Sequence, residues 1–340
     1  MTVREISCDE SSMWNSFVLE HAGATPFHLF GWKRVFENSY QLSARYLGGF
    51  KDGALVGLLP TAVIRHPFGE PFAVSLPICG FAGTLARPDV DREEMEREFL
   101  SYLTSKGVPS LELRTLDVTS TEKSDEQLLR LKINGPAEVI WKSLDTNERN
   151  KIRKVEKLGL TVDWARCGAD EFFHIYARRM ARLGTPTHSR QFFAEILSQF
   201  RESAAILGVR KDGKYIAAMF LSRFRNELYD VWAASLPEYD SLRPNMLLYW
   251  EAIKYACANG VETLDLGRSN INSGAHQFKL QWGATPYPLD YKVLSRDGSY
   301  SSSLVQTYRV SLGRYLSSTW KMLPLRTSMW LRPKLRKYIP

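Results

Sequence analysis

Short alternating runs of apolar residues and longer helical patterns follow one another in this 340-residue chain. Leu47–Arg65 and Leu207–Arg225 each contain an apolar run, a Lys-Asp-Gly turn and a longer alternating run. Asp-Gly between two β-patterned runs predicts a hairpin, because glycine accepts the positive φ of a tight turn. We therefore predict one β-hairpin in each half of the chain.

A helix and then a strand are predicted after each hairpin. The helical patterns are Asp91–Leu103 and Asn245–Cys257, and each is followed by a glycine suited to the position after a helix C-terminus. The strands that come next, within Ser105–Asp117 and Ala258–Asn270, share the form Gly-Val-x-Ser/Thr-Leu-acid-Leu. The order hairpin, helix, strand thus occurs twice, which indicates an internal duplication.

This order is the core of the GNAT acyltransferase fold. We expect an α/β (α+β) protein of two tandem GNAT-like lobes, residues 1–150 and 151–300, followed by a basic amphipathic tail, residues 301–340. The charged helical segment "DTNERNKIRKVEKLGLTV" is expected at the join of the lobes. Fold alone does not define function, so the site residues must be considered separately.

Composition is that of a globular protein, with 44% hydrophobic and 24% charged residues. The four cysteines form no CxxC pair and the six histidines have no ligand spacing, so we expect no metal site. The N-terminus has no apolar signal-peptide core, and the longest uncharged run is too short and too interrupted to span a bilayer. A cytoplasmic protein is expected.

The net charge of +8 lies in the tail, since residues 301–340 carry eight Lys and Arg and no acid. The body is therefore neutral, which argues against general nucleic-acid binding by charge alone. The tail also carries Trp320 and Trp330 among helically spaced apolar residues, a pattern typical of contact with the inner face of an anionic membrane. Alternatively, the tail docks on the second lobe and its basic end is solvated or contacts RNA.

The glycine-rich loop that holds the CoA pyrophosphate in acetyl-CoA GNAT enzymes is missing. Before the second predicted helix the sequence is "YDSLRPNMLL", where Pro244 removes a backbone donor, and the first lobe has acidic "RPDVDREEM". The sequence also lacks GxSxG, HExxH, Walker and GxGxxG motifs. Because the usual pyrophosphate loop is missing, we predict that the donor is not acetyl-CoA.

The stretch "RPNMLLYWEAIKYACANGVETLDLGRSNINSGAHQFKLQWGA" resembles the second-lobe signature of the FemABX-type transferases. Softer similarity over most of the chain is to a Gram-negative branch associated with exopolysaccharide and PEP-CTERM protein-sorting clusters. The resemblance implies tandem GNAT-like lobes and transfer of an aminoacyl group from charged tRNA to an amine of a cell-wall precursor. The coiled-coil arm of some relatives is not visible in this sequence.

The resemblance and the polar loop after the second-lobe strand suggest a site. Amide formation needs positive charge where the oxyanion develops. We assign this role to Lys279 and Arg268, with Asp230 as the candidate general base. Substrate-binding residues are predicted in both lobes: Trp282, Gln277, Gly274, Ser269, Asn245, Tyr229, Lys33 and Trp32.

Each assignment has a purely structural alternative. Arg268 could pair with Asp265 or Asp290, Lys279 could be a solvated cation, and Trp282 could be a core residue with no exposed ring face. Asn245 could be only a helix N-cap, Asp230 could be buried with a backbone partner, and Lys33 could be a surface helix lysine.

The expected function is therefore an N-acyltransferase of FemABX type that forms an amide on a cell-envelope precursor. We expect no cofactor beyond the donor substrate, which is aminoacyl-tRNA. A lipid- or sugar-amine N-acyltransferase using acyl-CoA or acyl-carrier protein is one alternative. A non-catalytic scaffold in envelope-polysaccharide assembly is the other.

Overall fold

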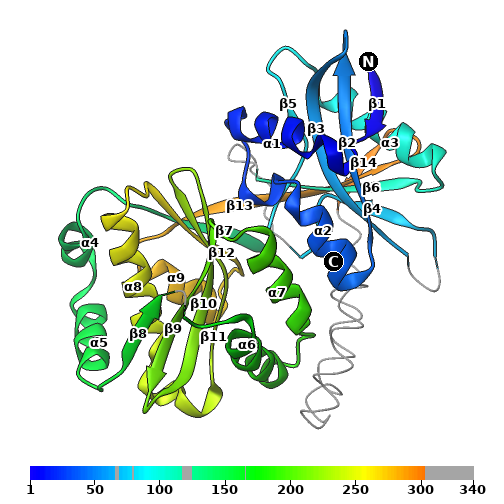
Figure 1. Ribbon diagram of the computed structural model, residues 1–340. Helices are drawn as coiled ribbons and strands as arrows, with labels where there is room; N and C mark the ends of the chain where they lie inside the picture. Colours follow the sequence, from blue (N-terminus) through cyan, green and yellow to red (C-terminus); the bar gives the residue numbers. More distant parts are fainter. Residues whose placement is uncertain (66–68, 79, 117–124, 165, 303–340) are drawn as a thin grey trace. The chain divides into compact units, whose positions relative to one another are not determined.

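The computed structural model describes residues 1–65, 69–78, 80–116, 125–164 and 166–302 (Figure 1). These residues form two compact units. Unit 1 contains residues 1–116 and 289–302, and unit 2 contains residues 125–288. The predicted amphipathic tail lies outside the described residues from position 303 onward. No described helix is long and apolar enough to cross a membrane.

Unit 1 is a mixed sheet with helices packed on it. The strand order is β1-β2-β3-β4-β6-β13, with β5 paired to β3 and β14 paired to β13. Met95 and Phe99 of the long helix α3 pack on the buried face of this sheet. The strands are β1 (Thr2–Glu5), β2 (Ser43–Lys51), β3 (Ala54–Ile64), β4 (Phe72–Val74), β5 (Leu85–Ala86), β6 (Ser110–Leu116), β13 (Thr285–Ser295) and β14 (Tyr300–Ser302). The helices are η1 (Cys8–Glu10), α1 (Ser11–Glu20), η2 (Pro26–His28), α2 (Gly31–Tyr40) and α3 (Arg92–Ser105).

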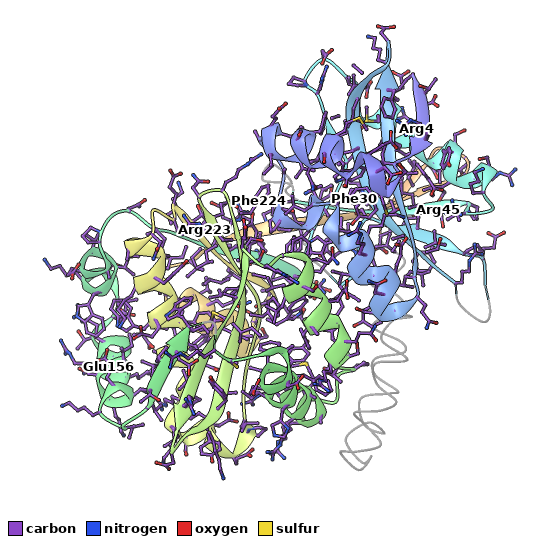
Figure 2. All side chains as sticks on the ribbon, viewed as in Figure 1. Arg4, Phe30, Arg45, Glu156, Arg223 and Phe224 are labelled. Atoms are coloured by element: carbon purple, nitrogen blue, oxygen red, sulfur yellow. The ribbon has the colours of Figure 1, made fainter. Side chains whose placement is uncertain are left out.

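An aromatic cluster joins α1 and α2 to the sheet of unit 1. Trp14 lies 4.8 Å from Tyr46 and 5.8 Å from Phe30, measured between ring centroids. Next to Tyr46 on β2 lies Arg45, labelled in Figure 2. Its guanidinium forms an ion pair with Glu5 on β1. These contacts fix the N-terminal segment to the hairpin β2–β3.

Unit 2 has the strand order β7-β12-β11-β10-β9-β8, and Thr285–Pro288 of β13 pair with β7. Helices α4, α5 and α8 lie on one side of this sheet, and α6 and α7 lie on the other (Figure 1). The strands are β7 (Glu126–Lys132), β8 (Thr161–Trp164), β9 (Ala204–Lys211), β10 (Lys214–Phe224), β11 (Glu227–Ser235) and β12 (Thr263–Asn270). The helices are α4 (Ala137–Ser143), α5 (Thr146–Glu156), α6 (Ala169–Leu183), α7 (Arg190–Gln199), η3 (Pro237–Leu242), α8 (Pro244–Ala258) and α9 (Gly274–Leu280).

The predicted double order of hairpin, helix and strand is confirmed. In the hairpin β2–β3 the turn residues Asp52 and Gly53 have φ of 51° and 78°, and Asp212 and Gly213 of β9–β10 have 49° and 78°. Positive φ at both central residues defines the type I′ turn that suits the right-handed strand twist. In each unit a strand that precedes the long helix pairs in parallel with the strand after it. In unit 2 these strands are β11 and β12, and in unit 1 they are β4 and β6, with the short β5 between β4 and α3.

The unit boundaries differ from the predicted limits at 150 and 300. Residues 126–156 belong to unit 2, because β7 pairs with β12 and because Ile140 and Ile152 pack in the same core as α8. Residues 289–302 belong to unit 1, because this part of β13 pairs with β6. A repeat in the sequence locates the duplicated elements, but it does not show which unit a connecting strand joins.

Candidate active site of the second unit

The strands β11 and β12 pair in parallel over only three positions, Glu227–Tyr229 with Thr263–Asp265. Beyond them lies Gly267, with φ of +73°. A Cβ at this position would lie 3.1 Å from the backbone oxygen of Asp230 and 3.7 Å from Nζ of Lys279. Glycine is therefore required both by the left-handed backbone and by the close approach of these two residues.

Lys279 is buried at this point. It comes from α9, whose first turn is capped by Ser273 Oγ accepting from the N–H of His276. The Lys279 side chain donates from Nζ to the carbonyl oxygens of Gly267 (3.2 Å) and Arg268 (3.0 Å), and the residue is only 8% exposed. An ammonium has three N–H donors, so within the described residues one donor is left for a ligand. The solvated-cation alternative is thus excluded.

Asp230 supplies a second buried charge near Lys279. Tyr249 of α8 donates a hydrogen bond of 2.6 Å to Asp230 Oδ2, while among the described residues Oδ1 has no partner. Burial raises the pKa of Asp230 to about 6, against the opposing effects of the Lys279 charge and the Tyr249 hydrogen bond. Burial also lowers the pKa of Lys279, and the charges of Asp230 and Asp265 counteract this shift. The pKa values of Asp230 and Lys279 therefore lie closer together than those of the same groups in water.

Trp282 is a core residue. It is 2% exposed, stacks on Tyr249 at 6.0 Å between ring centroids, and meets Phe278 edge-on. Its ring faces are covered by protein, which contradicts the prediction that it stacks on a base or sugar of the substrate. Its buried Nε1 has no hydrogen-bond partner among the described residues.

Arg268 forms an ion pair that was not predicted. Its guanidinium lies 3.1 Å from Glu126 of β7, a partner other than the predicted Asp265 and Asp290. Asp265 is held by Arg130 of β7 (3.1 Å), which sequence reasoning missed. No local signal marks Arg130, since 135 residues separate it from Asp265.

Tyr229 belongs to the Arg130 cluster and is separate from Lys279. Its hydroxyl donates to Glu227, which also pairs with Arg130. Because adjacent residues of a strand point to opposite faces, Tyr229 and Asp230 lie on different sides of the sheet. Tyr229 is therefore bonded within this cluster, on the face of the sheet opposite the Asp230 side chain.

The remaining predicted residues of unit 2 vary in position. Ser269 is buried and donates to the backbone oxygen of Arg268 (2.8 Å), which supports the loop next to Lys279. Asn245 is not the N-cap of α8, because Arg243 is; it lies one turn before Tyr249, and its buried Oδ1 has no partner in the described part of the chain. Gly274 and Gln277 are exposed on α9.

Trp32 and Lys33 are bonded within unit 1. Trp32 is 2% exposed and donates from Nε1 to the Pro26 oxygen (3.0 Å). The Lys33 ammonium donates to Glu37 (2.9 Å) and to the Ala44 oxygen (2.6 Å). These partners tie α2 to its own unit, so the predicted substrate contacts of both residues are not supported.

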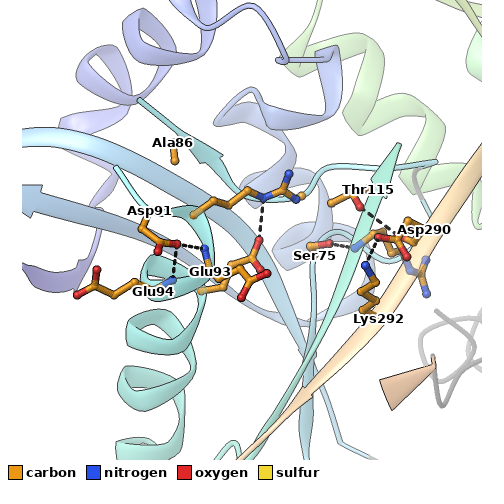
Figure 3. Close-up of polar contacts among 12 residues, drawn as sticks. Ser75, Ala86, Asp91, Glu93, Glu94, Thr115, Asp290 and Lys292 are labelled. Atoms are coloured by element: carbon orange, nitrogen blue, oxygen red, sulfur yellow. Dashed lines mark hydrogen bonds and ion pairs between the residues drawn. The ribbon is translucent and has the colours of Figure 1, made fainter. Parts of the chain in front are cut away.

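Unit 1 contains a cavity of about 370 Å³ at the start of α3. Figure 3 shows polar contacts of residues that line it, among them Asp290 and Lys292. Its ionic side chains are paired with one another, Arg92 with Glu96 (2.9 Å) and Lys292 with Asp290 (2.9 Å). The charged residues that line this cavity therefore differ from Lys279, which is buried and bonded only to backbone oxygens.

Comparisons with known proteins show the fold and the enzyme class. Residues 142–280 match the sequence profile described as an acetyltransferase (GNAT) domain. FemX aligns with 91% of this chain and 99% of its own, at a TM-score of 0.63 and 15% identity. The chain has the tandem GNAT fold of FemX. The predicted FemABX-type architecture is thereby confirmed.

Two further structures share the tandem GNAT fold. L-PGS from Bacillus licheniformis aligns over 92% of this chain and 98% of its own, at a TM-score of 0.55 and 14% identity. A tandem GNAT protein from the clavulanic acid biosynthesis pathway aligns over 88% and 99%, at 0.55 and 11%. No curated protein matches the sequence. The acetyltransferase-domain match also confirms the predicted enzyme class, an acyltransferase.

Proposed function

We propose that this protein transfers an aminoacyl group from a charged tRNA to an amine of a cell-envelope precursor. The observation that carries the proposal is the buried ammonium of Lys279, fixed by two carbonyl oxygens and retaining one N–H donor within the described residues. A pre-oriented cation in a site of low dielectric stabilises an oxyanion far better than a solvated one. The shared fold with FemX supports an aminoacyl donor.

The proposed reaction is attack of a neutral amine on the ester carbonyl of the donor. A C–N bond forms, negative charge gathers on the carbonyl oxygen, and Lys279 stabilises it. The C–O bond to the ribose then breaks, and the ribose oxygen takes up a proton while the amine loses one. Asp230, with a pKa of about 6, is ionised at neutral pH and is the candidate acceptor of the amine proton.

A second candidate is transfer of an acyl group from a thioester, on CoA or acyl-carrier protein, to a lipid or sugar amine. The observation that favours it is the match of residues 142–280 to an acetyltransferase domain. The chemistry at Lys279 would be the same, since a thioester also passes through an oxyanion.

The test is to incubate purified protein with charged tRNA, acyl-CoA and acyl-carrier protein and to measure consumption of each, with candidate amines present. Lys279→Ala is expected to lower turnover of the accepted donor about 10²- to 10³-fold, as loss of an oxyanion donor does. Lys254→Ala is the matched control, because Lys254 is a surface lysine of the same unit paired with Glu251. Equal activity of the two variants would refute the role of Lys279.

A further inference from the structure

Asp230 Oδ1 and Asn245 Oδ1 of unit 2 are buried oxygen atoms with no hydrogen-bond partner among the described residues. Buried polar groups in proteins are nearly always bonded, because an unpaired one costs free energy. Both atoms are acceptors, since the Asp230 carboxyl, with a pKa of about 6, is ionised at neutral pH and a carboxamide oxygen carries only lone pairs. Together they suit a group that brings two hydrogen-bond donors.

Tyr249 connects the two side chains. Its hydroxyl donates to Asp230 Oδ2 at 2.6 Å. Asn245 precedes Tyr249 by four residues on α8, so the two are neighbours on one face of the helix. Helical side chains lean toward the N-terminus, so the Tyr249 ring extends from its own turn toward the turn that holds Asn245. The geometry points to one space beside the Tyr249 hydroxyl that both unpartnered oxygens border.

This space adjoins the Lys279 site. A Cβ on Gly267 would lie 3.1 Å from the Asp230 backbone oxygen and 3.7 Å from Lys279 Nζ, so Asp230 and Lys279 flank the same glycine. A nucleophile held at Asp230 is therefore next to the cation assigned above to the oxyanion. Because a nearby cation disfavours a second positive charge, the neutral form of an amine fits here better than its ammonium form.

We propose that Asn245 makes the site selective for a primary amine over a hydroxyl. A neutral primary amine has two N–H bonds, which would donate to Asp230 Oδ1 and Asn245 Oδ1 and leave the nitrogen lone pair free to attack the donor carbonyl. As the C–N bond forms, the proton shared with Asp230 passes to that carboxylate, while the other N–H stays bonded to Asn245. This inference rests on the proposed function and adds the residue that selects the nucleophile.

The selectivity follows from the number of hydrogens on the attacking atom. A hydroxyl or a secondary amine has one hydrogen to donate, and Asp230 takes it. Asn245 Oδ1 would then stay buried and unpaired, which is how a polar site rejects a close analogue of its substrate.

The experiment measures binding by fluorine-19 NMR, so it does not depend on turnover. The probes have nearly the same shape and are largely uncharged at pH 8: 2,2,2-trifluoroethylamine, its N-methyl derivative and 2,2,2-trifluoroethanol. The full-length protein is expected to bind the primary amine about tenfold more tightly than the other two, the effect of one more hydrogen bond to a buried acceptor. Asn245→Leu should remove this preference. Asn147→Leu should keep it, because Asn147 is exposed on α5.

Urea unfolding separates this role from a structural one. Leucine at position 245 would replace an unpaired buried oxygen by an apolar group of similar size, so Asn245→Leu is expected to be at least as stable as the unmodified protein. An asparagine that held the fold together would instead lose stability on replacement.

Equal affinity of the unmodified protein for the three probes, or a preference that survives Asn245→Leu, would overturn the inference, and water alone would then account for the unpartnered oxygens. Lower stability of Asn245→Leu with equal weakening of all probes would also overturn it. Preferential binding of the amine without transfer from any donor would count against the proposed function and leave the selectivity of Asn245 intact.

Discussion

Lys279 and Asp230 are buried groups of opposite charge, and neither keeps the pKa of an exposed side chain. Few hydrogen bonds hold these side chains in place. Two carbonyl oxygens accept from the Lys279 ammonium, and the Tyr249 hydroxyl donates to the Asp230 carboxylate. At the residue scale the site is therefore sensitive to small changes that leave the fold intact.

Tyr249→Phe removes the hydrogen bond that lowers the pKa of Asp230. The pKa should rise above about 6, so the carboxylate becomes ionised only at higher pH. If the ionised form is active, the rising limb of kcat/KM against pH moves upward by about one unit, and activity falls more at pH 6 than at pH 8. Tyr255→Phe is the control, since Tyr255 stacks on Trp164 away from Asp230. Superimposable profiles for the two variants would contradict the proposed role of Asp230.

Gly267→Ala is expected to destabilise the protein. The new Cβ would occupy a backbone with φ of +73° and lie 3.1 Å from the Asp230 oxygen, at an expected cost of about 1–3 kcal/mol in the free energy of unfolding. Gly274→Ala is the control, because no atom lies within 4 Å of its added Cβ and its φ is not positive. Urea unfolding of both variants tests this, and equal stability would show that Gly267 is not constrained.

At the element scale, the two units contain the same order of hairpin, long helix and strand, but their long helices begin differently. Both hairpins turn at Asp-Gly with positive φ. Both long helices lead into a strand that pairs in parallel with an earlier strand of the same unit, β6 with β4 and β12 with β11. The helix starts differ, since α3 is capped by Asp91 and α8 begins at Arg243 with no side-chain cap among the described residues. The two units therefore share the order of their elements and differ in how the long helix is capped.

Asp91→Ala should destabilise unit 1 by about 1 kcal/mol, the usual effect of losing an N-cap. The carboxylate accepts from two backbone N–H groups, which water would then have to satisfy. Asp89→Ala is the matched control, because Asp89 is exposed in the preceding loop. Thermal unfolding is the measurement, and an Asp91 variant as stable as the Asp89 variant would show that the cap contributes nothing.

At the scale of the whole molecule, the chain forms two compact units, and the boundary between them does not fall at the midpoint of the sequence repeat. Unit 2 includes β7, α4 and α5, which precede its hairpin in the sequence. The first residues of β13 pair with β7 of unit 2, and the later residues pair with β6 of unit 1. The hydrophobic core under α8 depends on these additions, since Leu129, Leu131 and Ile140 are part of it.

A fragment of residues 125–288 is therefore expected to fold, whereas a fragment of residues 151–288 is not. The shorter one lacks β7 and α4, and it exposes the apolar residues of α8 that they cover. Cooperative thermal melting by circular dichroism distinguishes the two. If the shorter fragment melted as cooperatively as the longer one, the core would not depend on residues 126–150.

Local patterns in the sequence determined the hairpins and the two helix–strand pairs, whereas Lys279 was chosen from a resemblance to the FemABX-type signature. Alternation, helical spacing and Asp-Gly turns act over a few residues, so they can be recognised without the fold. Tertiary structure alone decided the partner of Arg268, the burial of Trp282 and the assignment of residues 126–156 to unit 2. Glu126 and Arg268 are 142 residues apart, and they meet only because β7 pairs with β12. Strand pairing over such a distance leaves no local trace, because it depends on the burial of the whole sheet.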